Sequence, residues 1–310
     1  MRTPRAGPDP PRGRHQHHQH TAGVTMSNIQ HVTVLGTGVL GSQIAYQAAF
    51  AGKSVTAYDI NDDAVAAGRE RAAGLAKRYV SEVEGATAAN TAAALESMTF
   101  SSDLAQAVKD ADLVIEAVPE KLEIKRSTYE KLSAVAPAKT IFATNSSTLL
   151  PSDIVDASDR PEKFLALHFA NEIWKHNTAE VMPVPATSEE TKREVEEYAA
   201  EMGMVPIVLK KEKAGYLLNS LLVPWLDAAA GLWAGDYADP ETIDKTWKLA
   251  TGAPMGPFQV FDVVGLTTAY NITSANPDPA HQAVAAKLKE KIDAGELGVA
   301  TGKGFYSYGA

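Results

Sequence analysis

The segment LGTGVLG at residues 35–41 decides the fold of this chain. It has the spacing G-x-G-x-x-G. It lies between a β-branched run, QHVTVL at residues 30–35, and a stretch of helical composition, LGSQIAYQAAFAG at residues 40–52. The glycine spacing alone is weak evidence. Between a strand and a helix, however, it is typical of a loop that binds the pyrophosphate of a dinucleotide.

Each glycine of this loop has its own expected task. Gly36 allows a tight turn, Gly38 lets the backbone approach a pyrophosphate, and Gly41 lets the helix lie close to the strand. We expect the pyrophosphate at the helix N-terminus, where unpaired N–H groups and the helix dipole favour negative charge. The residues of this loop predicted to bind the cofactor are Gly36, Gly38, Val39, Leu40 and Gly41.

An acidic residue after the next strand-like segment predicts which dinucleotide binds. The segment SVTAY at residues 54–58 is followed by Asp59, 18 residues beyond Gly41, and the usual spacing is about 20. A carboxylate there can accept hydrogen bonds from both ribose hydroxyls of NAD, and it repels the 2′-phosphate of NADP. We therefore predict NAD as the cofactor, with a flavin as the alternative ligand.

Strand-like and helical segments continue to alternate through the first two thirds of the chain. The predicted strands are residues 111–118, 140–144, 164–169, 179–182 and 205–209, and the predicted helices are residues 61–84, 121–135 and 188–202. This alternation at this spacing predicts βαβ units and a parallel sheet.

The pattern becomes helical after Lys213. Helical segments are predicted at residues 215–234, 239–250 and 278–295, and Pro224 predicts a kink or a break in the first of them. The predicted fold class is therefore α/β, a Rossmann-type dinucleotide-binding domain followed by an all-helical C-terminal domain. We place the first domain at residues 26–210 and the second, for substrate and dimer contacts, at residues 211–310.

Length and composition agree with two soluble domains. The chain has 310 residues, of which 45% are hydrophobic and 22% are charged. It has no cysteine, which excludes disulfides, thiolate zinc sites, iron–sulfur clusters and a cysteine nucleophile. A formal net charge of -9 disfavours nucleic acid as a partner. No apolar run approaches the roughly 20 residues of a membrane span, so no membrane partner is expected.

Residues 1–25 are predicted to be a disordered extension. They mix Pro, Gly, Arg and His, and they contain no apolar run that could serve as a secretory signal. We therefore expect a cytoplasmic protein. Four histidines in this extension could bind a metal, although an inactive tail is the simpler reading. They are His15, His17, His18 and His20.

Three segments carry side chains suited to the oxidation of an alcohol. Ser147 follows the strand-like TIFAT, His168 lies in an apolar strand, and Glu180 lies 12 residues beyond it in another. A histidine can serve as general base, and a carboxylate on its second nitrogen would fix the tautomer. Taken alone, His168 is more typical of a core histidine. A Ser/His/Glu hydrolase is disfavoured because Ser147 lies outside a G-x-S-x-G elbow.

Over residues 28–308 the sequence resembles the L-3-hydroxyacyl-CoA dehydrogenase family, and particularly its 3-hydroxybutyryl-CoA dehydrogenases. Both halves of the chain carry the resemblance. The motifs are the glycine loop, VIEAVPE at 114–120, NSSTL at 145–149, LHF at 167–169, GYLLN at 215–219, PMGPF at 254–258, DVVGL at 262–266 and TGKGFY at 301–306.

The resemblance implies a role for each matching position. It implies His168 as catalytic base, Glu180 as its orienting acid, and Ser147 with Asn219 as the groups that hold the reacting oxygen and the thioester. It also implies contacts to the nicotinamide side of NAD, from Glu120, Lys125, Ser147 and Asn171.

One segment departs from the family pattern. The family commonly reads His-Phe-Phe-Asn-Pro, whereas this chain has HFANE at residues 168–172, followed by the polar loop IWKHNT at residues 173–178. Asn171 is kept, but Ala170 and Glu172 replace Phe and Pro. The resemblance therefore leaves the acyl-chain preference open.

The expected activity is reversible oxidation of an L-3-hydroxyacyl-CoA, with 3-hydroxybutyryl-CoA as the favoured substrate, by a homodimer. Lys77 and Arg78 are candidates for the phosphates of CoA, with a solvated helix face as the equally weighted alternative. Two other functions stay open. One is a dehydrogenase of a free hydroxy acid, such as carnitine or a sugar acid. The other is a non-catalytic NAD-binding relative, as some lens crystallins are.

Overall fold

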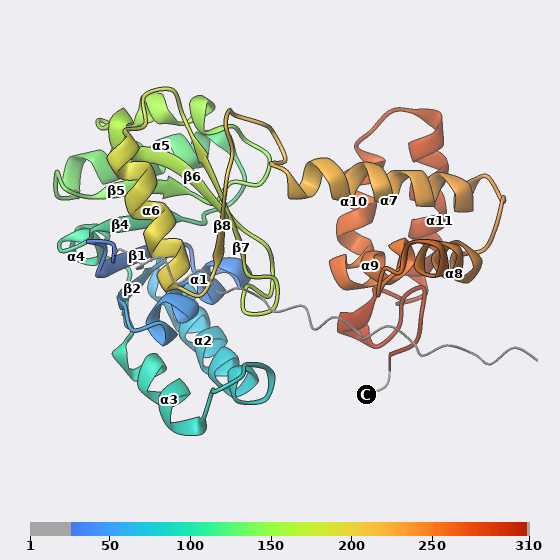
Figure 1. The fold of residues 1–310 in the computed structure, drawn as a ribbon, viewed down its shortest axis with the longest axis horizontal. Coiled ribbons are helices and arrows are strands. Elements are labelled where there is room, and N and C mark those ends of the chain that lie inside the picture. Colours follow the sequence, from blue (N-terminus) through green and yellow to red (C-terminus); the bar gives the residue numbers. More distant parts are fainter. Residues whose placement is uncertain (1–25, 309–310) are drawn as a thin grey trace, which may run out of the picture.

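A single eight-stranded sheet forms the first lobe of the computed structural model, which describes residues 26–308 (Figure 1). The strand order is β3-β2-β1-β4-β5-β6-β7-β8, and all neighbours are parallel except β6 and β7. The strands are β1 (His31–Leu35), β2 (Ser54–Tyr58), β3 (Thr99–Ser101), β4 (Leu113–Glu116), β5 (Ile141–Thr144), β6 (Phe164–Phe169), β7 (Thr178–Pro183) and β8 (Val205–Val208).

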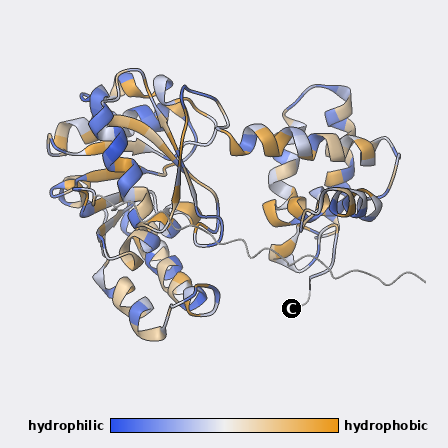
Figure 2. Ribbon diagram, viewed as in Figure 1, coloured by the Kyte–Doolittle hydropathy of each residue, from blue (hydrophilic) through white to orange (hydrophobic). Residues whose placement is uncertain are grey.

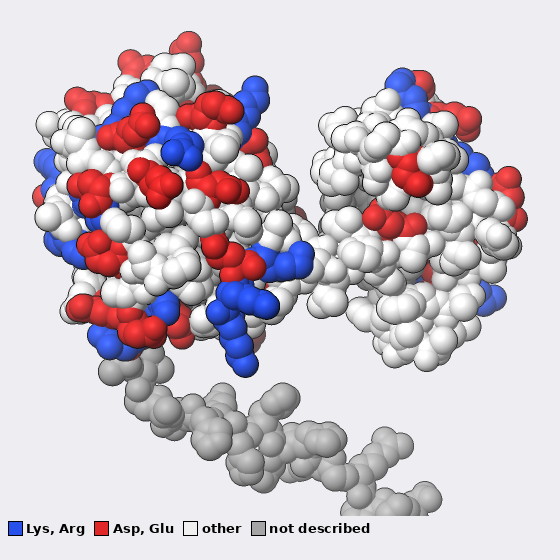
Figure 3. Space-filling view, turned by 90° about the horizontal axis from the view of Figure 1, so that it is seen from above, with Lys and Arg blue, Asp and Glu red and all other residues white. Residues whose placement is uncertain are grey.

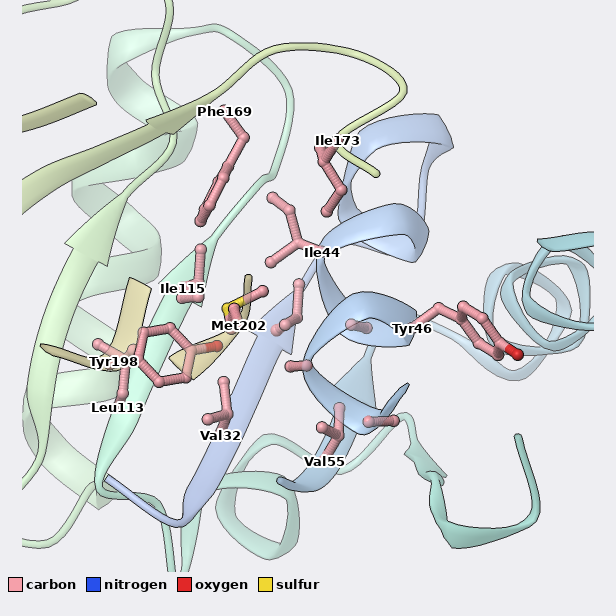
Figure 4. Packing of buried hydrophobic residues seen from close by; sticks show 14 of the residues in the cluster. Val32, Ile44, Tyr46, Val55, Leu113, Ile115, Phe169, Ile173, Tyr198 and Met202 are labelled. Carbon is pink, nitrogen blue, oxygen red and sulfur yellow. The ribbon is translucent and has the colours of Figure 1, made fainter. Parts of the chain in front are cut away.

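Helices cover both faces of this sheet, as expected for parallel strands that are buried on both sides. One face packs against α1 (Val39–Phe50), α2 (Asp62–Glu82), α3 (Ala88–Ser97) and α6 (Glu189–Glu201). The other packs against α4 (Leu104–Val108) and α5 (Leu122–Val135). Figure 4 shows the first core, where Ile44 of α1 lies between the strands and Ile173 of the β6–β7 loop.

The second lobe consists of helices and begins with α7, which extends away from the sheet (Figure 1). Phe258, Leu266 and Leu288 are buried in its core. Figure 2 shows that hydrophobic residues follow the strands of the first lobe, whereas the helices of both lobes carry both kinds of residue. The helices are α7 (Leu218–Ala234), α8 (Pro240–Thr251), α9 (Pro257–Val264), α10 (Leu266–Ser274) and α11 (Pro279–Asp293). Short 3-10 helices are η1 (Pro151–Asp153), η2 (Val155–Ala157), η3 (Pro161–Lys163) and η4 (Val299–Thr301).

The predicted fold class is confirmed, with two corrections of detail. α7 runs through Pro224 without a break, so of the predicted kink or break the break is wrong. Leu222 before the proline and Leu226 after it pack in the same core, and such tertiary packing can outweigh the roughly 3 kcal/mol that an internal proline costs. The sequence reading also missed α3, β3 and α4, which are short. The predicted extension at residues 1–25 lies outside the described residues.

Candidate active site

The carboxyl ends of four parallel strands bring the predicted site residues to one edge of the sheet. β1 ends at the glycine loop, β4 at Glu116, β5 just before Asn145, and β6 at Phe169, one residue after His168. The strand order reverses direction between β1 and β4. Ligands of open α/β sheets bind in the crevice at such a reversal point, so this edge is the candidate active site.

The glycine loop fits a pyrophosphate on structural grounds. A Cβ on Gly36, whose φ is +90°, would lie 2.6 Å from the carbonyl oxygen of Ala117, and one on Gly41 would lie 1.8 Å from the oxygen of Gly36. Both glycines are therefore required by the protein itself. A Cβ on Gly38 would meet nothing within 4 Å, so the open side of the loop lies there. Gly38 also begins α1 without a side-chain cap, which leaves N–H groups for an anion.

Asp59 fastens this loop to the end of β2. Its Oδ2 accepts hydrogen bonds from the amide and the hydroxyl of Thr37, both at 2.7 Å, and its Oδ1 accepts one from the amide of Ile60 at 2.8 Å. The carboxylate is half-buried and keeps lone pairs for further donors. Its place beside the glycine loop fits the ribose hydroxyls of NAD.

Ser147, His168 and Glu180 form a continuous hydrogen-bonded chain. The antiparallel register of β6 and β7 pairs His168 directly with Glu180, and their side chains meet at 3.0 Å between Nδ1 and Oε2. On the other side of the ring, Nε2 lies 3.1 Å from the Ser147 hydroxyl. His168 and Glu180 are buried, at 4% and 3% exposure. This geometry is the one that the predicted roles of base, orienting acid and hydroxyl require.

The remaining oxygen of Glu180 binds the start of the helical lobe. Oε1 accepts hydrogen bonds from the amides of Leu217 at 2.9 Å and Leu218 at 3.0 Å. Burial raises the pKa of Glu180, but the hydrogen bonds from His168 and these amides outweigh burial, and the pKa lies below its usual range. Glu180 is therefore ionised at neutral pH and accepts a hydrogen bond from Nδ1–H of His168, and Nε2 on the other side of the ring faces the Ser147 hydroxyl.

Glu120 holds the segment that carries Ser147. Its Oε1 accepts hydrogen bonds from the Ser146 hydroxyl at 2.5 Å, the Ser147 amide at 2.9 Å and the Thr148 amide at 2.8 Å. Burial raises the pKa of Glu120, but these hydrogen bonds and the charge of Lys125 outweigh it and lower the pKa to about 2. Glu120 thus fixes the backbone of Ser147 by accepting its amide hydrogen bond, and its predicted contact with the cofactor is a separate role.

Lys125 lies between two carboxylates and is only 1% exposed. Its Nζ is 2.7 Å from Oε1 of Glu116 and 3.2 Å from Oε2 of Glu120. Burial raises the pKa of Glu116, against the charge of Lys125 and the hydrogen bond from Thr144. The lysine thereby connects the ends of β4 and β5 behind the serine segment.

The segment that departs from the family pattern has a distinctive backbone. Glu172 has φ +56°, which proline cannot adopt because its ring fixes φ near −65°. The Glu172 carboxylate pairs with Arg78 of α2, and Arg78 also pairs with Glu82 at 2.9 Å. Lys175 contacts the same Glu82 at 2.8 Å. The loop after His168 is therefore attached to α2 by a network of ion pairs.

Not all predicted site residues make side-chain contacts at the site. Asn171 is exposed and follows Ala170 at the start of the same loop. Asn219 is half-buried in the first turn of α7, directly after the amides that bind Glu180. Lys77 is exposed, whereas Arg78 is occupied by Glu82 and Glu172. The roles of these four residues, like those of the other predicted site residues, stay predictions.

Two residues of the site were not singled out from the sequence. Tyr216 stacks on the His168 ring with centroids 4.3 Å apart, and the Asn145 side chain accepts a hydrogen bond from the Phe169 amide at 3.0 Å. Asn145 sits at a strand end beside Ser147, which was a usable signal. Tyr216 lies in the GYLLN motif, but only the long-range contact reveals its place beside His168.

Residues 26–308 offer neither a clustered metal site nor a membrane-spanning helix. In this range, no group of three or more His, Cys, Asp and Glu side chains is arranged to hold a metal ion. The same residues include no helix with the length and apolar character needed to cross a bilayer. A polar hollow of about 370 Å³ lies over β1, β2, β3 and α4, and it contains none of the predicted site residues.

Comparisons with known proteins agree with this architecture. Residues 31–213 match the model of the 3-hydroxyacyl-CoA dehydrogenase NAD-binding domain, and residues 215–308 match that of the 3-hydroxyacyl-CoA dehydrogenase C-terminal domain. The mitochondrial hydroxyacyl-coenzyme A dehydrogenase of Rattus norvegicus is 34% identical over 90% of this chain and 91% of its own length.

Two solved structures are similar over most of the chain. A diketoreductase, described as carrying out substrate-directed dual catalysis of dicarbonyl compounds, is 63% identical with a TM-score of 0.89, over 91% of this chain and all of that one. The (S)-3-hydroxybutyryl-CoA dehydrogenase of Ralstonia eutropha is 29% identical with a TM-score of 0.77, also over 91% of this chain and all of that one. The chain belongs to the 3-hydroxyacyl-CoA dehydrogenase family and has both its NAD-binding and its C-terminal domain.

Proposed function

We propose that this enzyme interconverts the 3-hydroxy and 3-oxo forms of a short acyl-CoA with NAD, and that 3-hydroxybutyryl-CoA and acetoacetyl-CoA are such a pair. The observation that carries the proposal is the chain Ser147–His168–Glu180, with contacts of 3.1 and 3.0 Å, at the same sheet edge as the glycine loop. A base for the hydroxyl and a loop for the pyrophosphate are the two parts that alcohol oxidation by NAD requires.

The chemistry assigned to the residues follows from their hydrogen bonds. Nε2 of His168 takes the proton of the substrate hydroxyl, and Glu180 stabilises the imidazolium that forms. The Ser147 hydroxyl, in contact with Nε2, holds the reacting oxygen, and the family resemblance assigns the Asn219 amide to the thioester. NAD, when bound at Gly36–Gly41 and Asp59, supplies the hydride acceptor. In the reverse direction His168 returns the proton to the oxygen of the ketone.

A second substrate class is a dicarbonyl compound without CoA. Two observations favour it. The solved diketoreductase is 63% identical over 91% of this chain, and Arg78, a candidate for the CoA phosphates, is already paired with Glu82 and Glu172. Acetoacetyl-CoA is itself a 1,3-dicarbonyl compound, so the two classes share the reacting group and differ in the remote group that the enzyme recognises.

The test compares kcat/KM with NADH for acetoacetyl-CoA, free acetoacetate and ethyl acetoacetate. If the CoA portion contributes binding energy to the transition state, acetoacetyl-CoA is reduced on the order of 100-fold better than free acetoacetate, a gap of roughly 3 kcal/mol. If kcat/KM for ethyl acetoacetate equals or exceeds that for acetoacetyl-CoA, the substrate class is CoA-free dicarbonyl compounds and not CoA thioesters. Oxidation of carnitine with a kcat/KM equal to or above that for the thioester would support the hydroxy-acid alternative. The absence of turnover with every substrate would support the non-catalytic alternative.

We also propose a homodimer formed through the helical lobe. Large apolar side chains are exposed there, including Leu221 at 75%, Leu249 at 77%, Ile272 at 56% and Val263 at 52%. Figure 3 shows one face on which charged residues are dense over the first lobe and sparse over the second. Large exposed apolar side chains with few charges around them are typical of an interface, and closed two-fold dimers are the commonest oligomers.

Sedimentation velocity tests the dimer with a matched pair of variants. Leu221→Glu places a charge on the helical lobe and is expected to shift the protein toward monomer. Val80→Glu, at a position of α2 that is 44% exposed, is expected to leave the dimer intact. A wild-type monomer at all accessible concentrations would refute the proposal.

A further inference from the structure

Tyr216 has an unusual backbone at the junction of the two lobes. Its φ is +53°, and it follows Gly215, whose φ is +79°. A bulky residue with positive φ is a genuine outlier. Such strain persists only where the surrounding structure over-determines it, and it gathers at functional sites. The side chain is nevertheless fully buried, at 1% exposure.

The side chain of Tyr216 contacts two parts of the catalytic arrangement. Its ring is stacked on the His168 imidazole, with centroids 4.3 Å apart and an interplanar angle of 12°. Its hydroxyl donates a hydrogen bond of 2.6 Å to the carbonyl oxygen of Ser146, the residue before Ser147. One side chain therefore supports both groups that meet at the 3.1 Å contact between Nε2 and the Ser147 hydroxyl.

The backbone after Tyr216 contacts Glu180, the third member of the hydrogen-bonded chain. The next two amides, of Leu217 and Leu218, donate to Oε1 of Glu180 at 2.9 and 3.0 Å. The two consecutive positive φ values thus turn the ring toward His168 and the following N–H groups toward its orienting acid. A relaxed backbone at this position would move one set of contacts or the other.

We propose that Tyr216 is a positioning residue for His168, holding the plane of the imidazole so that Nε2 faces the Ser147 hydroxyl while Nδ1 faces Glu180. The inference rests on the proposed role of His168 as base. Rotation of an imidazole about its Cβ–Cγ bond has a broad energy profile. One hydrogen bond to Glu180 does not fix this rotation angle. The parallel ring of Tyr216 does, because a rotated imidazole would collide with it.

The experiment compares Tyr216→Phe and Tyr216→Leu with a control pair at Tyr46. Tyr46 is fully buried in the first lobe, and its hydroxyl donates to a backbone carbonyl oxygen, that of Thr91, at 2.9 Å. It resembles Tyr216 in burial and hydrogen bonding, but its ring packs on Tyr79 instead of His168. Tyr46→Phe and Tyr46→Leu therefore report the general effect of changing a buried tyrosine.

Tyr216→Leu is expected to lower kcat about 10- to 100-fold, while the Kd for NADH stays within twofold. Tyr216→Phe keeps the ring and is expected to restore most of that loss, to within about fivefold of wild type. The Tyr46 variants are expected to keep the kcat of the folded fraction within twofold of wild type. If Tyr216→Leu does not fold, Tyr216→Gly takes its place, because glycine adopts the positive φ readily.

The double variant His168→Gln/Tyr216→Leu separates this inference from the proposed function. If Tyr216 acts through His168, the double variant is no slower than His168→Gln alone. A kcat for Tyr216→Leu within twofold of wild type, or an equal loss in Tyr46→Leu, would overturn the positioning role. Normal turnover by His168→Gln would instead overturn the base assignment itself.

Discussion

The two lobes bury carboxylates in different ways. In the first lobe, Glu180 and Glu116 accept hydrogen bonds from backbone amides and each also contacts a basic side chain, His168 or Lys125, which Asp244 and Asp262 of the helical lobe do not within residues 26–308. In the helical lobe, the two buried carboxylates are Asp244 and Asp262, each 1% exposed, and most of their partners are backbone amides.

The helical-lobe acids hold loops of the protein itself. Asp262 accepts hydrogen bonds from the amides of Phe305 at 2.7 Å and Tyr306 at 2.9 Å, and Asp244 accepts from the amide of Phe258 at 2.8 Å. A Cβ at Gly304 would lie 2.0 Å from Oδ1 of Asp262, and one at Gly256 would lie 2.3 Å from Cγ of Asp244. The PMGPF and TGKGFY motifs are therefore explained by structure, whereas Glu180 binds Nδ1 of His168, whose other ring nitrogen is the proposed proton acceptor.

The largest expected effect follows from the proposed role of His168 as base. His168→Gln is expected to lower kcat by about 10²–10⁴, the usual size of a general-base contribution, with little change in NADH affinity. Glu180→Gln is expected to cost less, because it acts through His168. Steady-state kinetics with acetoacetyl-CoA, or with the better dicarbonyl substrate, measure both. Near-normal turnover in His168→Gln would make it an ordinary core histidine.

Asp262→Asn is expected to do the opposite of His168→Gln, since it should lower stability and leave kcat unchanged. It replaces one carboxyl oxygen by an NH2 group, which cannot accept the hydrogen bond of the backbone amide that faces it, and a buried donor left without its acceptor costs about 1–3 kcal/mol. The free energy of unfolding is expected to fall by about 1–3 kcal/mol, while kcat of the folded enzyme is unchanged. Chemical denaturation gives the first quantity and kinetics below the transition the second. If Asp262→Asn lowers kcat without lowering stability, the buried acid of the helical lobe does not have the purely structural role that distinguishes it from Glu180.

Asp59 combines both kinds of partner, since it binds the backbone and the hydroxyl of Thr37. Wild-type enzyme is expected to prefer NADH to NADPH. Asp59→Ala is expected to reduce that preference about tenfold, because it removes both the ribose contacts and the repulsion of a 2′-phosphate. The ratio of kcat/KM for the two cofactors is the measurement. Equal use of both by wild type would contradict the assignment.

The smallest expected effect is a pH dependence at Glu120. Its pKa is lowered from 4.5 to about 2 in the folded protein, so its contribution to stability is present above pH 4.5 and is lost as pH falls toward 2. The difference in Tm between wild type and Glu120→Gln is therefore expected to be a few degrees at neutral pH and to shrink across this window. A Tm difference that is constant between pH 6 and pH 2.5 would be inconsistent with an ionised Glu120.

How far the sequence predicts this protein depends on the range of the contacts. The glycine loop, Asp59 and the alternating segments specify the first lobe, because each is a local pattern with a known geometry. The pair of His168 and Glu180 was also within reach, since two strands joined by a short loop pair in register and their separation is only 12 residues. Short elements such as α4 and β3 were missed because five or three residues show no periodicity.

Tertiary structure alone decided the surroundings of the base. The contacts of Tyr216 with His168, of Glu120 with the Ser147 segment, and of Arg78 with Glu172 join elements that are 48, 27 and 94 positions apart in the chain. No periodicity or spacing encodes such contacts, because they depend on how α2, α7 and the sheet edge pack. The sequence therefore indicated which groups are proposed to carry the chemistry, and tertiary packing determined how those groups are held.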